Sequence, residues 1–236
     1  MTVIDTEHHA AGGGHEESPR DRHRKEHMAV WMFIGGDFLF FALEIFCWFY
    51  LRTLNAQGGW RFTDCTKALS AQVSGTLAGN VPQTCTDGLG NPITHQIPTA
   101  APIHTIAIAV LAVAAGLFVW FAEVQGRKGS SRKATTPLLN VALLLIVGAI
   151  VWQIVQFQIL PFTTIQGTYA SVFEFYMGSN LAHFGLVLFI IMGLVVRSMK
   201  GKFEGGNWYQ LHLSRLWTMW VGISSAILAV VAVAFA

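Results

Sequence analysis

The sequence predicts an all-α integral membrane protein, a bundle of five transmembrane helices. Of the 236 residues, 53% are hydrophobic and only 12% are charged, about half the charged fraction of an average soluble domain. Five apolar stretches reach the roughly 20 residues that a helix needs to cross about 30 Å of hydrocarbon. A formal net charge of +2 gives no indication of a polyanionic partner. We therefore expect a membrane protein that binds no nucleic acid.

The apolar stretches cover approximately residues 29–52, 103–125, 137–159, 171–196 and 213–236. Each is too long for a core strand and too apolar on all sides for a surface helix. Pro102 and Pro137 stand at the expected starts of the second and third stretches, where a missing backbone N–H costs little. Pro161 follows the end of the third stretch. The transmembrane domain is accordingly expected to span residues 29–236.

Residues 1–28 are polar and hold most of the His residues of the chain. A cleavable signal peptide would need a short apolar core in this region, and the sequence has none there. We expect a flexible, cytoplasmic N-terminal segment. His8, His9 and His15 could bind a metal ion adventitiously, but a solvated tail is the simpler interpretation.

The distribution of Lys and Arg predicts the orientation, because basic residues remain on the cytoplasmic side of a membrane protein. They gather before the first stretch, between the second and third, and around the connection from the fourth to the fifth. These residues are Arg20, Arg22, Arg24 and Lys25; Arg127, Lys128, Arg132 and Lys133; and Arg197, Lys200, Lys202 and Arg215. We therefore expect a cytoplasmic N-terminus, a periplasmic C-terminus and an outer loop over residues 53–102.

Two of the three cysteines, Cys65 and Cys85, lie in this outer loop. In an oxidising compartment the pair can close a disulfide, and a ring of about 20 residues would stabilise the fold by roughly 3 kcal/mol. Two free thiols are the alternative, and alkylation of both cysteines in the unreduced protein would contradict the bridge. Cys47 lies in the first apolar stretch, where we expect it to pack against other side chains.

Polar side chains inside the apolar stretches are the candidate functional residues, because an ionisable group at bilayer depth costs about 2.5–3.5 kcal/mol. Asp37 and Glu44 share one stripe of the first stretch, two helical turns apart. They are candidates for proton handling or for contact with lipid headgroups. Structural hydrogen bonds to neighbouring helices are the alternative. We favour the functional role for Asp37 and the structural role for Glu44.

Five more polar residues occur in the third and fourth stretches. Gln153 and Gln156 share a face, and amides at this depth usually bond across helices. Asn180 and His183 also share a face, whereas Glu174 points elsewhere, so no single local site is expected. A lone intramembrane His is more often hydrogen-bonded than a ligand, and the sequence has no converging metal ligands, phosphate-binding Gly loop or nucleophile triad. We expect this chain to bind no metal and to contain no catalytic residue.

Two segments, GDFLFFALEIFCWFY and PFTTIQGTYASVFEFYMGSNLAH, resemble subunit III of the haem–copper respiratory oxidases in its five-helix bacterial form. Asp37 stands where the family has an acid before a Leu-Phe-Phe run. The matches along the second segment are Pro161, Phe162, Gly167, Tyr169, Ser171, Phe173, Gly178 and His183. The resemblance runs from about residue 29 to residue 220.

The sequence also departs from the family pattern, and it is identified as a divergent member. Asn180 replaces the first His of the family's paired-His motif, and Gln156 replaces the Glu of its Gln-x-x-Glu motif. Glu44 and Glu174 are acids where the family usually has apolar or aromatic residues. These two positions mark where the protein would differ from its relatives.

The resemblance implies a non-catalytic subunit of a cytochrome c or quinol oxidase, which couples oxygen reduction in aerobic respiration to proton pumping. Its main partner would be oxidase subunit I, beside other oxidase subunits, and haem and copper would reside in those partners. The resemblance also implies bound phospholipid, support of proton uptake and a place in the bacterial inner membrane. The sequence does not decide between cytochrome c and quinol as the electron donor.

Two other functions stay open. One is a subunit III-like protein that accompanies some nitric oxide reductases, a role that the altered His motif permits. The other belongs to a different class, a small membrane transporter or channel. Its pathway would be lined by Asp37, Glu44, Gln156 and Glu174.

Overall fold

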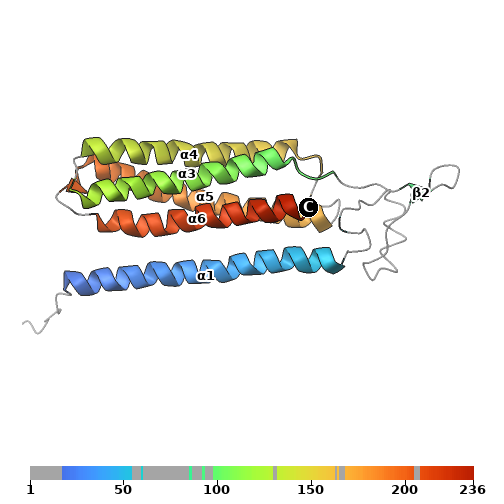
Figure 1. Ribbon diagram of the computed structural model, residues 1–236, viewed down its shortest axis with the longest axis horizontal. Coiled ribbons are helices and arrows are strands. Elements are labelled where there is room, and N and C mark those ends of the chain that lie inside the picture. The colour runs from blue at the N-terminus through green and yellow to red at the C-terminus, as the bar shows by residue number, and fades with distance from the viewer. Residues whose placement is uncertain are drawn as a thin grey trace, which may run out of the picture.

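The computed structural model is a bundle of long helices (Figure 1). It describes residues 18–54, 60, 85–86, 92–93, 98–129, 132–162, 164, 168–204 and 208–236. The helices are α1 (Pro19–Leu54), α3 (Pro102–Arg127), α4 (Arg132–Ile159), α5 (Thr168–Met199) and α6 (Tyr209–Ala234). All 5 are long and apolar enough to cross a membrane, which confirms the predicted fold class. Successive helices run in opposite directions along the bundle (Figure 1).

The segment between α1 and α3 contains two short paired strands. Strand β1 (Cys85–Thr86) pairs antiparallel with β2 (Pro92–Ile93), and Cys85 stands opposite Ile93. Cys65 lies outside the described residues, so the disulfide between Cys65 and Cys85 stays a prediction. Cys47, by contrast, is described as a free, half-buried thiol of α1.

Helix α1 begins at Pro19, well before the predicted residue 29, so the end of the predicted flexible segment is helical. The Ser18 side-chain oxygen accepts a hydrogen bond from the Asp21 backbone N–H at 3.2 Å, and its hydroxyl donates to Asp21 Oδ2 at 2.7 Å. Pro19 occupies the first helical position, where no N–H is needed. Ser-Pro followed by an acid is a helix-start signal that overrides the polarity of this segment.

Pro137 lies inside α4, which begins at Arg132, so the prediction that this proline starts the helix is wrong. The proline removes one main-chain hydrogen bond from the first turns. Its neighbour Thr136 shares a hydrogen bond of 2.8 Å with Ser198 of α5, which holds this end of α4 in place. The other boundaries agree with the predicted spans to within a few residues.

Helices α3 and α6 form the tightest pair of the bundle. A Cβ atom added at Gly222 would lie 3.1 Å from Val113 Cα and 3.2 Å from Ala112 O, so a larger residue would push the two backbones apart by a few tenths of an ångström. Side chains such as Ala115 and Val119 of α3 are fully buried beside it. The main apolar core therefore lies within the group of helices α3 to α6.

Helix α1 lies along one side of this group, next to α6 (Figure 1), and contacts α5 and α6. Near its C-terminal end Trp48 is fully buried. The Trp48 ring centroid lies 5.2 Å from that of Tyr176, 5.3 Å from Trp60 and 5.8 Å from Tyr169. This aromatic cluster fixes one end of α1 to the start of α5.

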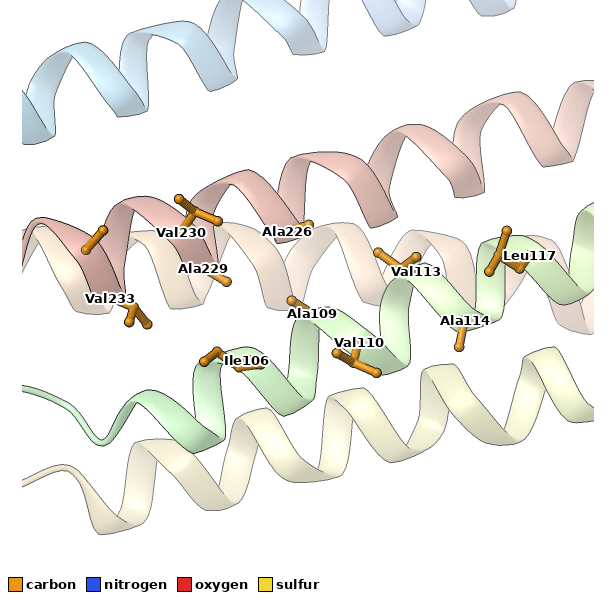
Figure 2. Close-up of a pocket in the computed structure, with 11 residues that line it drawn as sticks. Ile106, Ala109, Val110, Val113, Ala114, Leu117, Ala226, Ala229, Val230 and Val233 are labelled. Carbon is orange, nitrogen blue, oxygen red and sulfur yellow. The ribbon is translucent and has the colours of Figure 1, made fainter.

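An apolar groove of about 590 Å³ runs between α3 and α6. Figure 2 shows side chains of both helices along it, among them Ile106 and Val110 of α3 and Val230 and Val233 of α6. Every lining residue is Ala, Val, Leu or Ile. The groove therefore offers hydrocarbon contact and no polar group that could select a charged ligand.

Candidate functional site

Asp37 connects three helices through its two carboxyl oxygens. Its Oδ1 lies 2.7 Å from His183 Nε2 of α5, and its Oδ2 accepts a hydrogen bond of 2.6 Å from Trp220 Nε1 of α6. Both His183 and Asp37 are largely buried, with side chains 20% and 14% exposed. The two residues that carry the resemblance on separate segments, 146 positions apart, therefore meet directly.

The hydrogen bonds of His183 determine how many protons this pair holds. His183 Nδ1 lies 2.7 Å from the Ser179 main-chain oxygen, which only accepts, so Nδ1 must carry a hydrogen. Nε2 and the Asp37 carboxylate would then be two acceptors unless one more proton lies between them. The pair thus holds one proton in the Nε2–Oδ1 contact, as imidazolium with carboxylate or as imidazole with carboxylic acid. Either form is neutral overall, which suits a membrane interior.

Glu44 lies two turns further along α1 and is only 3% exposed. Ser179 of α5 lies close to its carboxyl group, and the Tyr176 hydroxyl donates to its main-chain oxygen. Among the described residues, Glu44 Oε1 has no hydrogen-bond partner, and such an orphaned buried atom costs about 1–3 kcal/mol. Ser179 therefore lies between the two acids of α1, in contact with His183 through its main-chain oxygen and close to Glu44.

The other predicted site residues lie elsewhere. Gln156 Nε2 donates to Thr105 Oγ1 at 2.9 Å, and Asn180 Nδ2 donates to Ser225 Oγ at 3.1 Å, both within the α3–α6 group. Gln153 is buried beside them at 2% exposure. Glu174 accepts a hydrogen bond from Thr164 just before α5. The 7 predicted residues thus divide into an α1–α5 site, an interior amide group and a separate Glu174.

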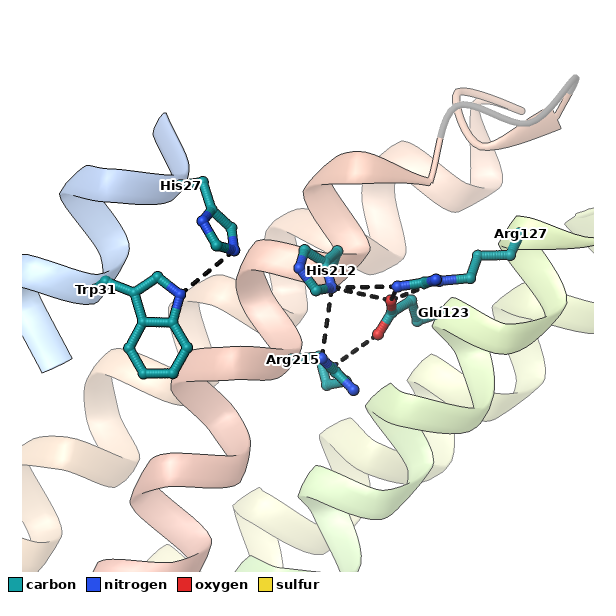
Figure 3. Close-up of polar contacts among 6 residues, drawn as sticks. All are labelled: His27, Trp31, Glu123, Arg127, His212 and Arg215. Carbon is teal, nitrogen blue, oxygen red and sulfur yellow. Dashed lines mark hydrogen bonds and ion pairs between the residues drawn. The ribbon is translucent and has the colours of Figure 1, made fainter. Parts of the chain in front are cut away.

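The sequence reasoning missed a charged cluster where the C-terminal end of α3 meets the N-terminal end of α6 (Figure 3). Glu123 of α3 is 1% exposed. Its Oε1 accepts hydrogen bonds from Arg127 Nε at 2.8 Å and Nη2 at 2.5 Å, and lies 3.0 Å from His212 Nδ1. Arg215 Nε is 2.8 Å from Glu123 Oε2, a close ion pair whose N–H is not aligned for a hydrogen bond. One buried carboxylate thus holds two guanidinium groups.

Aromatic rings join the first turns of α1 to this cluster. The His27 and His212 rings stack with centroids 5.6 Å apart, and His23 stacks on Tyr209 at 4.0 Å. His27 Nε2 also accepts a hydrogen bond of 3.3 Å from Trp31 Nε1 (Figure 3). The segment predicted to be flexible therefore packs on the start of α6.

Sequence signals for the missed residues were present but weak. Glu123 lies four residues before Arg127, a spacing that favours an ion pair on one helix face. Ser179 lies four residues before His183, on the same face of α5. Trp220 gave no signal, because an indole inside an apolar stretch ordinarily reads as core.

The site on α1 and α5 brings a carboxyl group and an imidazole into direct contact. In the part of the chain that the structure describes, no three or more His, Cys, Asp or Glu side chains converge as metal ligands. In comparisons with known proteins, no family model and no curated protein matches the chain.

Proposed function

We propose that this chain is a non-catalytic subunit III of a respiratory terminal oxidase in the bacterial inner membrane. The observation that carries the proposal is the Asp37–His183 contact of 2.7 Å. The resemblance matched these residues on two separate segments, and no local pattern in the sequence required them to meet. Their contact supports a common functional origin for the two matched segments.

The chemistry of the pair suits support of proton uptake. Asp37 and His183 hold one proton in a neutral unit, and Glu44 lies on the same helix beyond Ser179. Such groups can receive a proton and pass it to a neighbouring subunit without leaving a net charge in the membrane. The catalytic redox metals would reside in subunit I and other partner subunits.

The exposed surface of α1 supports a role in binding lipid and partner helices. Its large apolar side chains Met32, Leu39 and Phe46 are each at least 60% exposed. In a bilayer this surface faces acyl chains or the apolar side chains of subunit I. The predicted cytoplasmic N-terminus would place the Glu123 cluster near the inner headgroups, where Arg127 and Arg215 favour anionic phospholipid.

The decisive experiment is purification of the chain from its native membrane with its partners, followed by a mass-spectrometric inventory of proteins, haems and lipids. We expect haem- and copper-containing oxidase subunits in stoichiometric amounts. A nitric oxide reductase as the co-purified enzyme would instead support the related accessory role. Recovery of the chain without any haem or copper protein would contradict the subunit proposal and favour a transporter or channel.

Within the purified complex, Asp37→Asn should slow proton uptake or shorten the active lifetime while haem content stays unchanged, because the amide cannot deliver a proton to His183. Glu174→Gln is the matched control, since Glu174 contacts Thr164 and not this site. Turnover and lifetime equal to those of the unmodified complex would count against a functional Asp37. Loss of activity in Glu174→Gln alone would favour the transporter pathway.

A further inference from the structure

A small cavity with a few hydrogen-bonding groups in a largely apolar wall lies between α3, α4, α5 and α6. Its volume is about 20 Å³, enough for one water molecule. Residues of α3, α4, α5 and α6 line it, and those with hydrogen-bonding side chains are Thr105, Gln153, Gln156, Asn180 and Tyr176, whose hydroxyl donates to the Glu44 main-chain oxygen. Apolar side chains such as Ile108 and Leu228 complete the wall.

Two residues that line this cavity have buried amide oxygens with no partner in the described part of the chain. They are Gln153 Oε1 and Gln156 Oε1, on residues that are each 2% exposed. The Gln156 amide bonds to Thr105 Oγ1 at 2.9 Å, and reversing that amide would leave its nitrogen unpartnered instead. Orphaned polar atoms of this kind cost about 1–3 kcal/mol each. The cavity therefore needs a hydrogen-bonding occupant.

We propose that this cavity is a binding site for one water molecule that bridges Gln153 and Gln156. A water molecule has two O–H donors, which equals the number of orphaned acceptors. Its oxygen can accept the second N–H of the Asn180 amide, whose other N–H donates to Ser225 Oγ at 3.1 Å. No lining residue is charged, so a metal cation would lack compensation for its charge.

The bound water would complete a polar network across four helices. Gln156 already bonds to Thr105 of α3, and Asn180 of α5 bonds to Ser225 of α6. The water joins these two pairs through α4. This network is independent of oxidase membership, because it requires only the folded chain.

Water-edited solid-state NMR on the full chain in phospholipid bilayers tests the site directly. In protein labelled uniformly with ¹⁵N, the side-chain amides of Gln153 and Gln156 should receive water magnetisation several-fold faster than the backbone amides of Ala142 and Ala149. Those two alanines are fully buried on the same helix. The Gln153→Met and Gln156→Met variants assign the signals. If water magnetisation reaches the glutamine side-chain amides no faster than the backbone amides of Ala142 and Ala149, the cavity is dry and the proposal is overturned.

Thermal unfolding of Gln153→Met gives a second test. The melting temperature should change in one direction if the cavity holds water and in the other if it is dry. Methionine matches glutamine in length and carries no amide. If water bridges the two glutamines, the variant should lose about 2–4 °C of melting temperature, because the water loses an acceptor. If the cavity is dry, the variant removes an orphaned oxygen and melts at the same or a higher temperature, which would overturn the proposal. A melting temperature of the unmodified protein that rises with Na⁺ but not with choline would assign the site to a cation instead.

Discussion

Helix α3 and helix α1 are both held against α6, but by different physical means. Helix α3 approaches α6 so closely that Gly222 lies against the Val113 backbone. Helix α1 is joined to α6 by the Trp220–Asp37 hydrogen bond and the stacked His rings, and to α5 by the cluster around Trp48. Only 17% of the most apolar window of α1 is buried, against 56% for α6. Close packing is spread along α3, whereas the attachment of α1 depends on a few side chains.

This difference predicts two classes of variant. Changes at the α3–α6 contact should destabilise the whole bundle, because many neighbouring contacts depend on the same approach. Changes at the α1 attachments should loosen α1 while the rest of the bundle stays folded. The following variants test that separation, from the largest expected effect to the smallest.

Gly222→Leu should cost about 3 kcal/mol or more, because its Cβ would meet backbone atoms that cannot turn away. We expect a fall of about 6–12 °C in the melting temperature of the purified protein. Gly193→Leu is the matched control, since nothing lies within 4 Å of a Cβ at Gly193. Equal melting temperatures for the two variants would contradict backbone-close packing of α3 and α6.

Glu123→Gln should cost about 2 kcal/mol. Removing one partner of a buried ion pair leaves the other charges uncompensated, although Arg127, at 47% side-chain exposure, can turn toward solvent and limit the loss. The melting temperature should fall by about 4–8 °C. Glu26→Gln, which disrupts only the exposed pair with Arg22, should change it by less than about 2 °C. Similar losses in both variants would mean that the burial of Glu123 confers no special stability.

Asp37→Leu should loosen α1 by about 1–2 kcal/mol, because the contacts of the carboxyl group with His183 and Trp220 are both lost. Cys47, a half-buried thiol on α1, reports this opening. Its alkylation rate, followed by peptide mass mapping, should rise about 5- to 30-fold, while the melting temperature of the bundle changes little. An unchanged Cys47 rate would show that Asp37 does not hold α1 in place.

Ser18→Ala should have the smallest effect, because it removes the cap that accepts the Asp21 N–H. Fraying should be confined to the first turn of α1 and correspond to about 1 kcal/mol. Hydrogen exchange of the Asp21 amide should accelerate about fivefold, and Ser18→Asp should restore protection. Faster exchange throughout α1 in Ser18→Ala would instead make this cap part of the attachment of the helix.

The fold class could be predicted from the sequence because each apolar stretch is long enough to span a membrane by itself. The helix boundaries were harder to predict where two local sequence signals compete. At Ser18 and Pro19 a capping sequence lies in a charged segment whose polarity indicated disorder. At Pro137 the proline marks an early turn of α4, five residues after the helix begins at Arg132.

The individual residues of the candidate site could be predicted from the sequence, but their arrangement in space could not. Asp37, Glu44 and His183 each stand out because a polar group in an apolar helix is costly. Their connection through Ser179 depends on the register and rotation of α1 against α5, which helix periodicity does not determine. The Glu123 cluster is still harder to predict from the sequence, because His212, which contacts Glu123, lies 89 residues further along the chain. Near the end of an apolar stretch an acid also looks like an ordinary solvated residue.

The position of Asp37 gives α1 a mechanical property. The helix has 36 residues and is about 54 Å long at roughly 1.5 Å per residue, well beyond the roughly 30 Å of hydrocarbon. Asp37 lies close to its midpoint, with about 27 Å of helix on either side. The helix is also held near both ends, by the His23 and His27 stacks at one and by the Trp48 cluster at the other. Asp37 therefore divides α1 into two arms of similar length, and each arm has an attachment of its own.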